Sequence, residues 1–135
     1  MKKLISAFLC FATLATTAMS AEEYGDISLK DLKKAIAEKK VTVIDVNGEE
    51  SFQKNHIPSA VDYTAHKEDL AKVLPEDKDA LIVAYCGNPA CNAYKMAAKD
   101  AVEMGYTNVK HYSGGIAGWM KAGEKTEASK AAEKG

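Results

Sequence analysis

Arginine is absent from this chain, and all 18 of its basic residues are lysines. The formal net charge is only −1 at pH 7. Nucleic-acid binding needs a concentrated positive face, and base readout commonly uses the guanidinium fork of arginine. We therefore predict that nucleic acid is not a partner of this protein.

Cysteine is also scarce, with three residues in 135, which is too few for a small fold built on disulfides. The composition is 47% hydrophobic and 27% charged. These values are typical of a globular chain and exclude a collagenous, low-complexity or wholly disordered one. The length allows one ordinary α/β domain.

The N-terminus has the three-part pattern of an export signal. Two lysines open the chain, an apolar run extends from Leu4 to Leu14, and Ala18-Met19-Ser20 supplies the small-x-small pattern before Ala21. The apolar run is shorter than the roughly 20 residues that span a bilayer. We therefore predict a cleavable signal peptide over 1–20 and no stable membrane insertion after cleavage.

This leader predicts the compartment and the number of thiols. A two-lysine start with a short apolar run suits a Gram-negative bacterium, so we expect a periplasmic protein in an oxidising environment. Cys10 would be lost with the leader, which leaves Cys86 and Cys91. One folded domain would then occupy 21–122, followed by a flexible C-terminal tail over 123–135 that is rich in lysine, glutamate and alanine.

Strand and helix patterns alternate along the mature chain, which predicts a parallel sheet covered by helices on both faces. Predicted strands cover 41–46, 80–85 and 107–112, with a short strand after the turn at 56–61. Predicted helices cover 28–40, 49–54, 66–73, 92–104 and 116–121. In such folds reactive groups gather where strands end and helices begin.

One strand-to-helix junction carries a thiol. Cys86 ends the most apolar strand, a loop of small residues follows, and a helix is predicted beyond Asn92. Inward loop amides and the positive helix end would stabilise a thiolate, lowering its pKa from about 8.5 to roughly 3.5–7.5. Pro89 has no amide hydrogen to contribute. The alternative is a buried, inert cysteine. The predicted substrate-binding residues are Gly87, Asn88, Pro89, Ala90, Cys91 and Asn92.

Five segments, in order and spacing, resemble the successive signatures of single-domain rhodanese-like proteins. They are Asp45-Val46, His56-Ile57-Pro58-Ser59-Ala60, Tyr85-Cys86, Gly105-Tyr106-Thr107-Asn108-Val109 and Gly114-Gly115-Ile116-Ala117-Gly118-Trp119. The resemblance implies an α/β rhodanese-like fold with about five parallel strands and helices on both faces. It also implies that Cys86 is the catalytic residue, which accepts a sulfane sulfur, becomes a persulfide and passes the sulfur to a thiol or to cyanide.

Loop length separates branches of this family. A six-residue loop counted from the cysteine goes with sulfur transfer, and a seven-residue loop goes with the phosphatase and arsenate-reductase relatives. Cys86 to Cys91 counts six. A phosphatase is further disfavoured because no arginine is present to stabilise phosphoryl charge.

The sequence departs from the family pattern at several positions. Asn47 stands where many members have arginine, Asn55 and Ser59 stand where they have glycine, and Cys91 replaces the arginine of efficient thiosulfate users. Lys95 could substitute only as a point charge. We therefore expect weak thiosulfate:cyanide activity, or a persulfide as the natural donor.

Cys91 has three interpretations at this point. It is an inert helix-start residue, a resolving thiol that attacks the Cys86 persulfide, or half of a structural disulfide with Cys86. The spacing permits closure of a disulfide without requiring it.

Other candidates have supporting roles. Asp45 follows a strand and is expected to make local hydrogen bonds, and His56 is expected to brace its turn. His66 and His111 lack partners at metal spacing, so we predict no metal site and no cofactor. Trp119 is predicted to plug the core.

The leading hypothesis is a periplasmic sulfurtransferase of sulfur metabolism. Its partners would be a small sulfur-containing anion or persulfide donor and a thiol acceptor, small or on a protein. One alternative is a thiol–disulfide or sulfur-relay protein that cycles Cys86 and Cys91. Another is a non-catalytic rhodanese-fold binding module, although such relatives usually lose the cysteine.

Overall fold

A parallel five-stranded sheet organises residues 24–129, the part of the chain that the computed structural model describes. The strand order is β1-β5-β4-β2-β3, and every neighbouring pair is parallel. The strands are β1 (Gly25–Asp26), β2 (Val41–Asp45), β3 (Val61–Asp62), β4 (Leu81–Tyr85) and β5 (Val109–Tyr112). The predicted α/β rhodanese-like architecture is confirmed, with β4 at the centre of the sheet.

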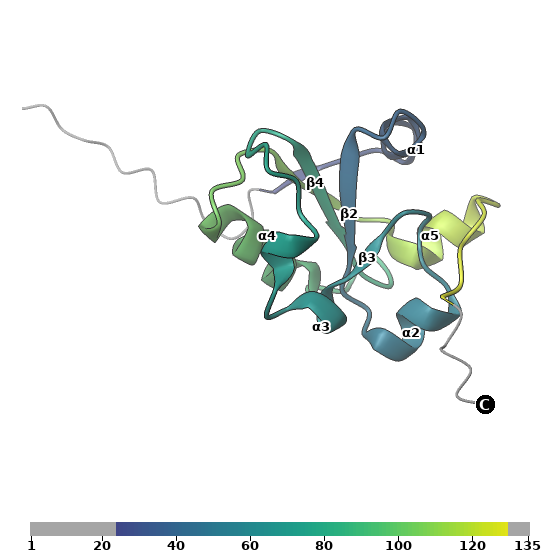
Figure 1. Cartoon of the computed structure of the whole chain (residues 1–135). Helices are drawn as coiled ribbons and strands as arrows, with labels where there is room; N and C mark the ends of the chain where they lie inside the picture. The colour runs from purple at the N-terminus through teal and green to yellow at the C-terminus, as the bar shows by residue number, and fades with distance from the viewer. Residues whose placement is uncertain (1–23, 130–135) are drawn as a thin grey trace, which may run out of the picture.

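Helices cover both faces of this sheet. Figure 1 shows α3 and α4 on one side of the strands and α1 and α5 on the other. The helical segments are α1 (Leu29–Ala37), α2 (Glu49–Lys54), α3 (Tyr63–His66), the 3-10 turn η1 (Leu70–Lys72), α4 (Tyr94–Glu103) and α5 (Gly115–Lys121). Burial on both faces explains why β4 is a continuous apolar run and why β2 is rich in β-branched apolar residues.

The alternation of side chains along β4 decides on which face of the sheet the Cys86 side chain lies. Ala84 and Cys86 belong to the apolar cluster beneath α4, and Tyr85 belongs to the cluster on the opposite face with Trp119. Successive strand residues point to opposite faces, so the first residue after β4 places its sulfur beneath α4. Trp119 is buried as predicted, and its ring lies edge-on to Tyr112.

Most helices begin within two residues of the start that the sequence predicted. The Ser28 hydroxyl accepts the Asp31 N–H at 3.1 Å and so caps α1 as expected. The single helix predicted over 66–73 is wrong, because α3 ends at His66 and η1 begins only at Leu70. The carboxylate of Asp62 caps α3 early by accepting the Thr64 N–H at 2.9 Å, which moves this helix towards the N-terminus.

The segment after α5 is docked on the domain as far as residue 129. Glu127 and His56 exchange two backbone hydrogen bonds of 2.9 and 2.8 Å, and Thr126 donates to Asn55 at 3.1 Å. This part of the predicted flexible tail is thus paired with the turn at 56–61. The remainder of that tail and the predicted signal peptide lie outside the described residues. Within 24–129, no helix has the length and hydrophobicity needed to cross a membrane.

Candidate active site around Cys86

Cys86 lies at the carboxyl end of the central strand, against the first turn of α4. Its side chain is only 1% exposed. Its sulfur accepts the backbone N–H of Tyr94 at 3.1 Å and also that of Ala93. The thiol therefore lies at the N-terminal end of a helix, where free amides and the helix dipole favour negative charge.

The cysteine loop, residues 87–92, is folded largely by Asn88. The Asn88 side-chain oxygen accepts the Ala90 N–H at 2.9 Å, and its carbonyl accepts the Cys91 N–H at 3.2 Å. These two amides are consumed inside the loop and do not face Cys86. The predicted ring of inward loop amides is therefore wrong in composition: among the loop residues Gly87 presents its N–H to a sulfur, that of Cys91.

The turn made by Asn88 returns Cys91 to Cys86. Cys91 is half-buried and packs against the apolar cluster that contains Cys86. The two thiols are close enough to shift each other's pKa, and the Ala93 N–H acts on both sulfurs. Both residues are free cysteines, so the structure holds two neighbouring thiols.

The pKa values of the two thiols shift in directions that the sequence analysis did not predict. Burial raises the pKa of Cys86 to about 12, and its hydrogen bond to Cys91 adds to the rise. Burial opposes ionisation of Cys91, but the hydrogen bonds from Cys86, Ala93 and Gly87 outweigh it and lower the pKa of Cys91. The expectation that the loop and helix amides lower the pKa of Cys86 is therefore wrong. These directions predict that the pair loses its first proton from Cys91.

Helix α5 holds the base of the cysteine loop. The Ile116 N–H donates to the Cys86 carbonyl at 3.0 Å, and the Ala117 N–H donates to the Gly87 carbonyl at 2.9 Å. Gly115 has φ of +63°, and a Cβ there would lie 2.6 Å from the Cys86 carbonyl oxygen. The sequence analysis identified this glycine only as a member of the motif at 114–119. Its close approach to the loop depends on tertiary packing.

Asp45 supports the site from the neighbouring strand. It is fully buried and accepts the Tyr85 hydroxyl at 2.5 Å and the Asn47 N–H at 2.7 Å. Burial raises the pKa of Asp45. The Tyr85 hydroxyl also accepts the Ile57 N–H at 3.0 Å. The Asn47 side-chain oxygen lies 3.3 Å from where a Gly87 Cβ would be, so these contacts connect β2 to the cysteine loop without placing Asp45 on a sulfur.

The two other predicted supporting residues lie in different surroundings. His56 donates its Nδ1–H to the Phe52 carbonyl at 2.7 Å and stacks on the Phe52 ring, which agrees with a bracing role. Lys95 is in the first turn of α4. Burial lowers the pKa of His111, and the charge of Lys95 lowers it further against the opposing effect of Asp26.

Sequence reasoning missed three contributions to this site. The sulfur contacts of Ala93 and Tyr94 are made by the backbone, which has no residue-type signature. The Tyr94 ring stacks on His111 of β5 with centroids 3.4 Å apart. The sequence could not have predicted the contact between Tyr94 and His111, because it depends on β5 lying next to β4 in the sheet.

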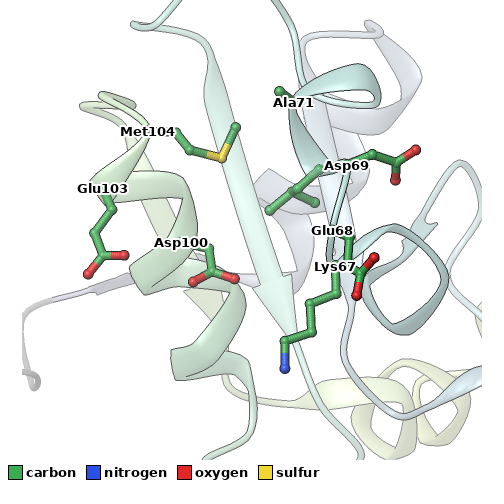
Figure 2. Close-up of a pocket in the computed structure, with 8 residues that line it drawn as sticks. Lys67, Glu68, Asp69, Ala71, Asp100, Glu103 and Met104 are labelled. Carbon is green, nitrogen blue, oxygen red and sulfur yellow. The ribbon is translucent and has the colours of Figure 1, made fainter.

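A separate hollow of about 370 Å³ lies between the η1 region and α4 (Figure 2), and neither Cys86 nor Cys91 lines it. Its lining includes the carboxylates of Glu68, Asp69, Asp100 and Glu103. Asp100 also accepts the Tyr63 hydroxyl at 2.6 Å. Crowded negative charge makes this hollow unsuitable for a sulfur-containing anion. Within residues 24–129, no cluster of three or more His, Cys, Asp or Glu side chains is arranged to hold a metal ion.

Comparison with known proteins agrees with this geometry. The family described as "Rhodanese-like domain" matches residues 28–122. The chain is 37% identical over 103 residues to the adenylyltransferase and sulfurtransferase UBA4 of Candida albicans, covering 69% of this chain and 23% of that protein. It is 31% identical over 86 residues to the thiosulfate sulfurtransferase GlpE of Pseudomonas savastanoi pv. phaseolicola, covering 63% of this chain and 77% of that protein.

A solved structure shows the same architecture. The BH2092 protein of Bacillus halodurans superposes with a TM-score of 0.62 at 27% identity, over 78% of this chain and 77% of that one. The chain spans about a quarter of the Candida protein, so it corresponds to one part of that larger protein.

Replacing Gly115 by alanine tests the packing of α5 on the cysteine loop. The new Cβ would meet the Cys86 carbonyl, and φ is positive, so we expect the free energy of unfolding to fall by more than about 1 kcal/mol. Urea denaturation measures it. The matched control is Gly118→Ala in the same helix, where the Cβ meets only the Tyr112 hydroxyl at 3.4 Å. Equal stability of the two variants would contradict the assigned contact.

Proposed function

Because the chain belongs to the rhodanese-like domain family, we propose that it is a sulfurtransferase that carries a sulfane sulfur as a persulfide on Cys86 and passes it to a thiol or to cyanide. The observation that carries the proposal is the position of Cys86. Its sulfur ends the central strand at the start of α4, contacts two backbone amides and has a second thiol as proton acceptor. The names of the sulfurtransferase relatives support the same chemistry.

Loading begins with proton transfer between the two thiols. The Cys86 proton passes along the existing hydrogen bond to the Cys91 thiolate. The Cys86 thiolate then attacks the sulfane sulfur of a donor R–S–S⁻, which forms the Cys86 Sγ–S bond and breaks the R–S bond. The donor leaves as a thiolate. Because the Cys86 side chain is 1% exposed, the cysteine loop must open for the donor to reach it.

Transfer reverses these roles. An acceptor thiolate or cyanide attacks the outer sulfur, and Cys86 leaves as a thiolate. The product is a new persulfide or thiocyanate. The Tyr94 and Ala93 amides stabilise the charge on the Cys86 sulfur as it leaves.

The charge around the loop favours a persulfide over thiosulfate as donor. Cys91 occupies the position where efficient thiosulfate users have arginine, and the chain has no guanidinium to bind a dianion with two parallel hydrogen bonds. Lys95, in the first turn of α4, is a lone ammonium on a flexible stem. A singly charged persulfide needs less compensation.

We expect sulfur loading to require Cys86. The Cys91→Ser variant, which cannot form a Cys86–Cys91 disulfide, is incubated to completion with glutathione persulfide, thiosulfate or 3-mercaptopyruvate. Trypsin releases residues 79–95, which contain positions 86 and 91. Its fragmentation spectrum should place one added sulfur on Cys86, removable by cyanide, with the least addition from thiosulfate. Sulfur that adds equally well to the Cys86→Ser variant would contradict the proposal.

We further propose that the protein acts in the periplasm, supported by the leader pattern at 1–20. Expression of the full chain in a Gram-negative bacterium should yield a periplasmic protein whose intact mass begins at Ala21. The control is Leu9→Lys, which interrupts the apolar run and should keep the chain in the cytoplasm. Full-length wild-type protein in the cytoplasmic fraction would contradict export.

A further inference from the structure

We propose that Cys91 resolves the Cys86 persulfide within the same loop, releasing hydrosulfide and leaving a Cys86–Cys91 disulfide. The inference rests on the proposed function, because it begins from the persulfide on Cys86. It adds an activity to simple sulfur transfer: the chain reduces sulfane sulfur with its own two thiols.

The geometry of the loop places the second thiol where this reaction needs it. The Cys91 N–H donates to the Asn88 carbonyl at 3.2 Å, and this turn brings the Cys91 side chain back onto Cys86. Cys91 packs against the apolar cluster that contains Cys86, and the two thiols shift each other's pKa. Thiols placed this close need only a short approach to reach the ~2 Å length of a disulfide.

The surroundings suit a buried disulfide. Cys86 belongs to the apolar cluster under α4, and Cys91 packs against the same cluster. Loss of two thiol hydrogens removes weak donors from an apolar region and leaves no charge behind. An arginine at position 91 would instead bind an anion and could not close a bond with Cys86.

The step balances without an external oxidant. The Cys91 sulfur, which holds the proton received from Cys86 during loading, attacks the Cys86 Sγ and passes that proton to the outer sulfur. The Sγ–Sγ bond forms, and the bond from Sγ to the outer sulfur breaks. The outer sulfur leaves with the electron pair and takes a proton as hydrosulfide. The sulfane sulfur gains two electrons, and the two thiols lose them. A further turnover requires an external dithiol to reduce the disulfide.

The difference in pKa between the two thiols supports Cys91 as the attacking sulfur and Cys86 as its target. Cys91 is the more exposed thiol of the pair, and its lowered pKa favours release of the proton that it took from Cys86, so it can act as the nucleophile once Cys86 carries the sulfur. The Gly87 and Ala93 amides hold that sulfur beside its target. An external acceptor must therefore compete with a nucleophile already in place.

A single-turnover experiment tests this inference. The full chain is reduced, freed of reductant and incubated without oxygen with one equivalent of glutathione persulfide. Released hydrosulfide and the 79–95 peptide are then measured. Wild-type protein should release one hydrosulfide per loaded chain, and its peptide should be lighter by two hydrogens. Cys91→Ser should keep the added sulfur and release no hydrosulfide.

Two controls separate resolution from other effects. Unloaded wild-type protein should remain a dithiol under the same conditions. Val102→Ser, on an exposed part of α4, should behave like wild type. If Cys91→Ser does not fold, the wild-type measurement decides alone.

The outcomes distinguish this inference from the proposed function. Wild-type protein that keeps its added sulfur and releases no hydrosulfide overturns resolution and leaves the sulfurtransferase proposal standing. Hydrosulfide release without a disulfide also overturns resolution. Protein that takes up no sulfur and forms no disulfide, in wild type and variant alike, overturns the proposed function and this inference together.

Discussion

The contact between two sulfurs at the start of α4 is the interaction on which the chemistry of this protein depends. Cys86 is buried and keeps its proton, and Cys91 accepts a hydrogen bond from it and ionises more easily. A single amide, that of Ala93, contacts both sulfurs. A second thiol thus stands where a permanent positive charge would attract a dianion. In the proposed function, this exchange favours chemistry between thiols over the binding of a dianion.

The sheet sets this contact through the alternation of side chains on β4. Ala84 and Cys86 face α4, and Tyr85 between them faces the opposite layer. The Tyr85 hydroxyl donates to Asp45 of β2 in that opposite layer. The end of β4 therefore makes contacts on both faces of the sheet. Helix α5 completes the support by donating two N–H groups to the carbonyls of Cys86 and Gly87. The sheet, α4 and α5 therefore together position the Cys86 sulfur.

Much of this architecture was readable from the sequence, and the failures have identifiable causes. Apolar runs such as 80–85 are strong signals of buried parallel strands, and the rule that sites form at strand ends located Cys86. The ring of loop amides around Cys86 was mispredicted because residue types do not reveal that Asn88 would accept the hydrogen bonds of the Ala90 and Cys91 amides. The acidity of Cys86 was mispredicted because burial, which a loop sequence does not display, outweighs the helix amides.

The order in which the two thiols ionise tests the account most directly. Cysteine labelled with carbon-13 at Cβ reports each thiol separately in a pH titration followed by nuclear magnetic resonance, with Cys91→Ser and Cys86→Ser to assign the signals. The account predicts that Cys91 titrates first, below the range of an ordinary thiol, and that Cys86 remains protonated until far higher pH. A Cys86 signal that titrates before that of Cys91 would contradict it.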